Sequence, residues 1–258
     1  MAHRVIADVI GRRLAEPADR RTAAPAHRRA GGARRARFAT AALTIVAAGL
    51  ALLPAARARA QDAGAILDRA VAAYGRVSTF RADFVQEVSD PMIGGTEPSR
   101  GEFLQQRPNR FAMRWRQPRG DLIVADGQYL WVFLPSSTPN QVVRSRLTGR
   151  AGESADIVAE FLDRPRDRFG VAYVRADRAG ARVADVLALT PLQRSASYSR
   201  VLIWVDRRDA LVHKVEITEA SGSVRRIAFD RIRTNVRIPA SAFTFQPPAG
   251  IRVVDASP

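Results

Sequence analysis

GEFLQQRPNRFAMRW, residues 101–115, places two runs of alternating side chains on either side of Arg107-Pro108-Asn109. Alternation of apolar and polar residues with a period of two is typical of strands that bury one face. Proline and asparagine favour a turn, and they lie between the two runs. The stretch therefore predicts two neighbouring antiparallel strands with these residues on apolar faces: Phe103, Phe111, Met113 and Trp115.

Strand signals continue towards the C-terminus. In DLIVADGQYLWVF, residues 121–133, Asp126 and Gly127 tolerate the positive φ of a tight turn, so the segment predicts a hairpin. A second hairpin is predicted around residues 206–209, and residues 223–238 add at least one more strand. An antiparallel sheet of this many strands tends to curl, and it can enclose a cavity when something covers the mouth.

Two segments carry a helical period. Residues 62–74 have apolar side chains at the spacing of a one-sided helix, Leu67 and Val71 among them. Residues 153–162 predict a shorter helix, with Ser154 as its N-cap and with Ile157 and Phe161 on its apolar face. No shift in composition divides the chain after residue 60. The fold expected is one domain, mainly β with α, in which a curled antiparallel sheet is covered by two helices.

The positive charge is concentrated near the N-terminus. The formal charge of +16 over 258 residues first suggests a nucleic acid or an anionic membrane as partner. Residues 1–60 hold 12 of the 41 basic residues and three acids, whereas residues 61–258 have 29 basic and 22 acidic residues, interspersed. A nucleic-acid partner is therefore not predicted.

Residues 1–60 have the three parts of a secretory signal peptide. Arginines precede an apolar run from Ala39 to Leu53, and a small-residue motif ends at Ala60. The apolar run of 15 residues is shorter than the roughly 20 that a membrane-spanning helix needs. We expect export and cleavage after Ala60, which leaves residues 61–258 as a single domain.

The chain lacks the usual combinations of catalytic residues. It has no cysteine and no nucleophile-elbow, zinc-protease or phosphate-loop motif. His213, the one histidine after residue 60, is expected to face solvent beside Lys214. Asp126 precedes a turn glycine, so a turn role is favoured over that of a general base. We therefore predict no enzyme, no metal site and no cofactor.

Two aromatic groups share strand faces: one contains Phe111, Met113 and Trp115, and the other contains Tyr129, Trp131 and Phe133. They form either an ordinary core or the wall of an apolar ligand space, in which a soft residue such as methionine adapts to its ligand. The pattern alone leaves both interpretations open.

Several motifs, in this order, resemble the outer-membrane lipoprotein carrier family, LolA. They are YGRVSTFRADFVQ (74–86), residues 101–118, LIVADGQYLWVF (122–133), LALTP (187–191) and FTFQPPAGIRVVD (243–255). The resemblance covers residues 62–255. It implies an unclosed β-barrel around an apolar cavity with a helical lid, acting as a monomeric periplasmic chaperone without catalytic residues or cofactor. The absence of cysteine favours this soluble carrier over the receptor of the same fold, which is anchored through an acylated cysteine.

The resemblance also implies partners and roles. The partners are acylated lipoproteins, the inner-membrane transporter that releases them, and a receptor in the outer membrane or that membrane itself. Arg107 matches the arginine that holds the lid closed through backbone carbonyls, and Phe111 the aromatic at the cavity mouth. Lid residues are expected at Leu67, Val71, Ile157 and Phe161. Acyl chains are expected to contact Phe84, Phe111, Met113, Trp115, Leu122, Val124, Trp131 and Phe133.

Three other functions compete with the carrier. A periplasmic lipid or lipoprotein sensor on the same fold is the alternative. A lipid hydrolase is opposed by the missing nucleophile constellation. A structural envelope protein would leave the apolar face and the lid helices without a purpose.

Overall fold

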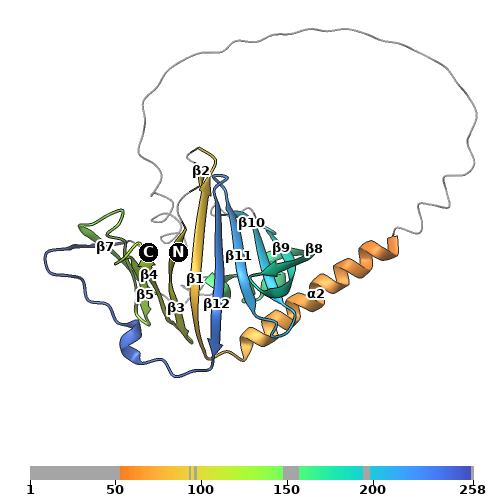
Figure 1. Cartoon of the computed structure of the whole chain (residues 1–258), viewed down its shortest axis with the longest axis horizontal. Helices are drawn as coiled ribbons and strands as arrows, with labels where there is room; N and C mark the ends of the chain where they lie inside the picture. The colour runs from red at the N-terminus through yellow and green to blue at the C-terminus, as the bar shows by residue number, and fades with distance from the viewer. Residues whose placement is uncertain (1–52, 93, 96–97, 148–156, 194–197, 257–258) are drawn as a thin grey trace, which may run out of the picture.

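The computed structural model describes residues 53–92, 94–95, 98–147, 157–193 and 198–256. These residues form one sheet, three helices and a 3₁₀ turn (Figure 1). The helical elements are α2 (Leu53–Gly75), α3 (Ile157–Leu162), α4 (Pro165–Arg168) and η2 (Ala240–Phe243). The strands are β1 (Thr79–Asp90), β2 (Gly94–Gly95), β3 (Ser99–Gln106), β4 (Arg110–Gln117), β5 (Leu122–Asp126), β6 (Tyr129–Phe133), β7 (Gln141–Arg146), β8 (Phe169–Ala179), β9 (Arg182–Pro191), β10 (Tyr198–Asp206), β11 (Val212–Glu219), β12 (Val224–Thr234) and β13 (Arg252–Asp255).

The strands follow one another along the sheet as two meanders that meet at β1. The order is β13-β7-β6-β5-β4-β3-β1-β12-β11-β10-β9-β8, with β2 paired to β1. Neighbouring strands are antiparallel in every described pairing except that of β13 with β7, which is parallel. The path ends at β13 on one side and at β8 on the other, so the sheet curls without closing into a barrel.

The two faces of the sheet bury different groups of side chains. The concave face and α2 share one large apolar cluster that includes Phe84, Phe103, Leu187 and Ile203. On the convex face, η2 and its neighbours pack on β4 and β5 and form a second, smaller cluster around Phe243. A third convex cluster surrounds Trp204 on β9 and β10. Burial of the concave face under a helix gives the sheet its core.

Helix α2 crosses the end of the sheet formed by β8, β9 and β10 (Figure 1). It contains the whole predicted helix of residues 62–74, and it begins earlier, at Leu53. The expected cleavage point after Ala60 thus falls within this helix, whereas residues 1–52 of the expected leader lie outside the described residues. Among the described helices, none has the length and apolarity that a membrane span requires.

The predicted second helix corresponds to α3, which occupies residues 157–162. Its expected N-cap, Ser154, lies outside the described residues. Pro165 begins α4, where its fixed φ suits the first turn of a helix. The curled, unclosed antiparallel sheet with a helical cover confirms the predicted fold.

Candidate functional site

The concave face is built from rows of directly paired apolar residues. In one row Phe103 of β3 pairs with Met113 of β4. Met113 pairs with Ile123 of β5, and Ile123 with Val132 of β6. Directly paired residues on antiparallel strands point to the same face, and all four side chains are buried. The row therefore forms a continuous apolar band across four strands.

Aromatic rings occupy the centre of this face. The ring centroid of Phe103 lies 5.2 Å from that of Phe111 and 5.2 Å from that of Phe229. The rings of Phe84 and Trp115 are 5.3 Å apart. All three pairs meet edge to face, which suits the charge distribution of aromatic rings and fixes their mutual orientation.

The eight predicted acyl-contacting residues lie on two faces. Phe84, Phe111, Met113 and Trp115 belong to the concave cluster. The expectation that Trp131 and Phe133 would share a wall with them is wrong, because Val132 is the residue of β6 that pairs into the concave row. In the same register, two more of the predicted residues, Leu122 and Val124 of β5, lie on the convex face.

The length of the turn between β5 and β6 could have predicted the register of these two strands from the sequence. The loop Gly127-Gln128 joins β5 to β6, and Gly127 has a φ of 105°. A loop of two residues places Val124 opposite Trp131 and Ile123 opposite Val132. The concave residues of β5 and β6 that the sequence prediction missed are therefore Ile123, Ala125, Leu130 and Val132.

The convex residues of β5 and β6 pack on the segment that follows β12. Val124 and the partly buried Leu122 belong to the cluster that contains Phe243. The ring of Phe245 lies 5.9 Å from Trp131 and 5.8 Å from Phe133. These four predicted residues thus contact the C-terminal segment in this conformation.

The helical cover contributes its own apolar side chains. Leu67 is fully buried in the concave cluster, and Val71 packs against it partly buried. Phe161 of α3 is buried, with its ring 5.7 Å from that of Tyr198. The side chain of Ile157 lies outside the described residues. The three described lid candidates are thus brought together with the concave face.

Polar contacts connect α2 to its surroundings at two places. Arg166 of α4 donates from Nε and Nη2 to the carboxylate of Asp68, at 3.1 and 2.7 Å. At the C-terminal end of α2, the buried hydroxyl of Tyr74 donates to Oε1 of Gln105 in β3, at 2.8 Å. A bidentate arginine contact and a buried hydrogen bond both fix orientation. The helix is therefore tied both to α4 and to the middle of the sheet.

Arg107 lies beside the second of these contacts, the hydrogen bond between Tyr74 and Gln105. Its guanidinium carbon is 4.4 Å from the centroid of the Tyr74 ring, so the cation stacks on a residue of α2. Its backbone N–H donates to the carbonyl of Ser78 at 3.0 Å. The predicted contact was with lid carbonyls; here the guanidinium meets the ring of a lid residue. The side chain is exposed, so solvent can compete for it.

A cleft of about 580 Å³ opens beside Arg107, between the β3–β4 and β5–β6 turns. The lining residues are Gln106, Arg107, Pro108, Asn109, Arg110, Asp126, Gly127 and Gln128.

Asp126 has the structural role that its turn position predicts. Burial tends to raise the pKa of this carboxyl. Hydrogen bonds from the backbone of Tyr129, the indole of Trp131 and the backbone of Gln128 outweigh it, so the pKa is lowered. A carboxylate with three such donors is held ionised in the turn and is a poor proton acceptor.

Helix α3 brings one carboxyl group into the core. Burial raises the pKa of Glu160, although Arg168 donates to its side chain and, at 2.6 Å, to its backbone carbonyl. Burial also raises the pKa of Tyr198 to about 12, and the nearby charge of Glu160 adds to this shift. These groups connect α3 to the beginnings of β8 and β10.

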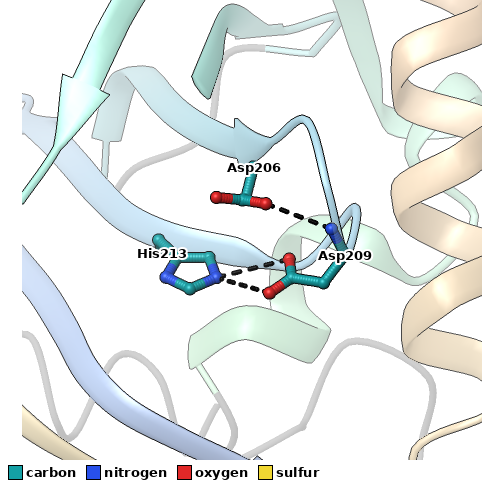
Figure 2. A group of neighbouring side chains, drawn as sticks. All are labelled: Asp206, Asp209 and His213. Carbon is teal, nitrogen blue, oxygen red and sulfur yellow. Dashed lines mark hydrogen bonds and ion pairs between the residues drawn. The ribbon is translucent and has the colours of Figure 1, made fainter. Parts of the chain in front are cut away.

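The expectation for His213 is wrong. Its side chain is buried, because a bulge in the pairing of β10 with β11 turns it towards Asp209 and away from solvent. Figure 2 shows the imidazole facing that carboxylate at the β10–β11 turn.

Comparison with known sequences gives one consistent family. Residues 75–246 match the family described as outer membrane lipoprotein carrier protein LolA. An outer-membrane lipoprotein carrier protein of Ralstonia nicotianae is 32% identical over 225 residues, which cover 84% of this chain and 99% of that protein. One of Albidiferax ferrireducens is 32% identical over 187 residues, covering 69% and 85%.

Among solved structures, similar chains include the LolA superfamily protein of Nitrosomonas europaea. It is 19% identical, with a TM-score of 0.37, and the match covers 71% of this chain and 97% of that one. An uncharacterised conserved protein of Thermus thermophilus is 13% identical, with a TM-score of 0.49 and coverage of 76% and 99%.

Proposed function

The chain belongs to the LolA family of outer-membrane lipoprotein carrier proteins, and on this basis we propose that it carries lipoproteins through the periplasm. It would bind the acyl chains of a lipoprotein released from the inner membrane and deliver them to the outer membrane. The relatives with curated names are named carriers, which favours this role over the sensor alternative and over an enzyme.

One observation carries the proposal: the apolar concave face is continuous with the apolar face of α2 in a single buried cluster. Acyl chains could enter by replacing the helix side chains on the sheet, which requires α2 and α3 to move outward. Each CH₂ group kept from water contributes about 0.8 kcal/mol, so several acyl chains offset the free energy needed to separate the helices from the sheet. The aromatic rows of β3 and β4 would then contact the chains.

Release of the lipoprotein requires contacts that favour the empty carrier, because the buried acyl chains would otherwise not dissociate. Closure of α2 restores the Tyr74–Gln105 hydrogen bond, the Arg107–Tyr74 contact and the Asp68–Arg166 ion pair. These contacts favour the empty, closed carrier, and they therefore lower the net affinity for cargo. The transporter that loads the carrier and the acceptor that unloads it would act on this equilibrium.

Incubation with spheroplasts that retain lipoproteins tests the proposal. The purified chain is expected to release them as soluble one-to-one complexes, detected by size exclusion and by antibodies to the lipoprotein. Uptake of free acyl lipids without lipoprotein would contradict it and support the sensor.

Photo-crosslinking adds a matched pair of probes within the same complexes. A photoreactive phenylalanine at Met113 points to the concave face, and one at Trp131 points to the convex face. Crosslinks to lipoprotein are expected from position 113 and not from position 131. Crosslinks from position 131 and none from position 113 would exclude the concave face as the acyl site.

A further inference from the structure

Three potential metal ligands gather at the β10–β11 turn, away from the aromatic rows. Asp206 ends β10, Asp209 lies in the turn, and His213 follows in β11 (Figure 2). One ligand atom from each lies within 4.8 Å of the others. Residues close in sequence supply all three, so the turn alone assembles the group.

One carboxylate oxygen of Asp206 accepts hydrogen bonds, and the other accepts none. Oδ1 accepts the backbone N–H groups of Arg208 and Asp209, at 2.7 and 3.1 Å. Oδ2 is buried and has no hydrogen-bond partner in the described part of the chain, and the whole residue is only 2% exposed. A buried carboxylate oxygen without a hydrogen bond is unfavourable unless a nearby positive charge compensates it.

The other two ligands already face each other. Nε2 of His213 lies 3.1 Å from Oδ2 and 3.3 Å from Oδ1 of Asp209. The N–H of Leu211 donates to Asp209 Oδ1 at 2.9 Å, which orients this carboxylate as the N–H donors orient Asp206. Ligands held by such outer hydrogen bonds are preorganised for a metal.

Arg182 supplies the positive charge between the carboxylates in this conformation. Its Nη1 lies 3.0 Å from Oδ2 of Asp209 and 3.5 Å from Oδ2 of Asp206. The side chain of Arg182 is 45% exposed, whereas that of Asp206 is 1% exposed. The guanidinium can therefore move into solvent while the carboxylates stay in place.

We propose that Asp206, Asp209 and His213 form a binding site for a divalent zinc ion that competes with Arg182. Two carboxylates and an imidazole are ligands that zinc accepts, whereas calcium and magnesium prefer oxygen alone. Zinc–ligand distances near 2.1 Å place tetrahedral ligand atoms about 3.4 Å apart. The Asp209–His213 separation already suits this, and a carboxylate oxygen of Asp206 lies within 4.8 Å of the ligand atoms of both.

Calorimetric titration of the full-length chain, purified without a histidine tag, with zinc chloride tests the site. The wild type is expected to bind one zinc ion per chain at this site. His213→Gln and Asp209→Asn are each expected to weaken binding at least tenfold. Arg182→Gln is expected to strengthen binding about threefold or more, because it removes the competing cation. Asp167→Asn, an exposed acid on α4 outside the cluster, serves as the matched control and is expected to leave the affinity unchanged.

The arginine variant separates metal binding from a structural role of the cluster. His3 and His27 remain in every variant, so the difference between wild type and His213→Gln isolates His213. Zinc is also expected to raise the melting temperature of the wild type and of Arg182→Gln, because a ligand that binds the folded state stabilises it. Equal zinc affinity of wild type and His213→Gln, or weaker binding by Arg182→Gln, would overturn the proposal.

Discussion

At the scale of single residues, Gly101 shows how tightly the centre of the sheet is built. A Cβ atom at this position would lie 2.1 Å from the carbonyl oxygen of Arg114 and 2.6 Å from the ring of Phe84. Backbone on one side and a buried ring on the other leave no room for a methyl group. Gly101 pairs with Trp115, so the small residue is what lets Phe84 and Trp115 meet over it.

Gly101→Ala is therefore expected to lower the free energy of unfolding by about 3 kcal/mol, the upper part of the range for overpacked cores. Urea denaturation followed by tryptophan fluorescence measures the change. Gly95→Ala is the matched control, because a Cβ atom added to this residue of β2 would meet no other atom within 4 Å. Similar free energies of unfolding for both variants would show that β3 and β4 can move apart at Gly101 at little cost.

Arg107 tests the proposed control of release. Loss of an exposed cation–π contact weakens closure by about 0.5–1 kcal/mol, which shifts the ratio of closed to open carrier roughly twofold to fivefold. Arg107→Leu is thus expected to hold cargo longer and to slow its transfer to acceptor membranes. Arg110→Leu removes the same charge from the exposed first residue of β4, just after the same turn, and is expected to transfer at the wild-type rate. Equal rates for wild type and Arg107→Leu would contradict a latch.

Glu160 makes stability depend on pH. Its pKa is raised in the folded protein, so between its ordinary value of 4.5 and the raised value the folded state binds more protons than the unfolded state. Stability contributed by the neutral form is present below pH 4.5 and is lost as the pH rises through the folded pKa. Glu160→Gln is expected to flatten this decline, as measured by urea denaturation at several pH values from about 4 upward. An unchanged slope would show that the carboxyl is ionised throughout.

At the scale of elements, the C-terminal segment protects both a face and an edge of the sheet. The segment with Phe243 and Phe245 covers β4 to β6, and β13 then pairs with β7 in parallel. Arg144 also binds Asp255 through two hydrogen bonds, at 2.6 and 2.9 Å. Without β13, the backbone groups of β7 would be open to pairing with another chain.

Truncation before Ile251 is therefore expected to make the protein self-associate, whereas the full chain is expected to sediment as a monomer. Sedimentation velocity at tens of micromolar protein distinguishes the two. Asp255→Asn keeps the strand and removes the ion pair, so it is expected to stay monomeric. A truncated chain that sediments as a monomer would show that β7 is protected by other means.

At the scale of the whole molecule, most of the fold could be predicted from the sequence. Residues 101–115 and the Asp126-Gly127 turn correctly indicated neighbouring antiparallel strands, because alternation and turn residues are local signals. The helix over residues 62–74 followed from its apolar period. These features depend on residues close together along the chain.

The arrangement of the site was less predictable because it depends on strand registers, a bulge and contacts between elements rather than on the pattern of one segment. The face to which Trp131 points is fixed by the register of β6 against β5 and of β5 against β4. The stacking of Arg107 on Tyr74 joins residues of a helix and a turn. The burial of His213 follows from a bulge between β10 and β11. None of these leaves a repeating pattern in the sequence.

Basic and acidic side chains are interspersed on one part of the sheet, as the sequence of residues 61–258 suggested. A hollow of about 300 Å³ on the convex side of β1, β3, β4 and β12 is lined by arginines together with Asp83 and Glu102. Arg116 and Arg231 both pair with Asp83, and Arg81 pairs with Glu102 at 2.7 Å. Arginines paired in this way form a solvated strand face.

The central place of β1 sets the order in which the chain can fold. Ser223 donates to Asp90 at 2.7 Å although 133 positions separate them, and every pair of residues between β1 and β12 is still further apart in sequence. The meanders β3–β7 and β8–β12 can each form from local hairpins, but their junction waits until β12 has been made. Such long loop closure is slow, on a scale of milliseconds to seconds. While the chain is made from its N-terminus, β1 therefore keeps one open edge until β12 has been synthesised, and during that interval the chain needs protection from aggregation.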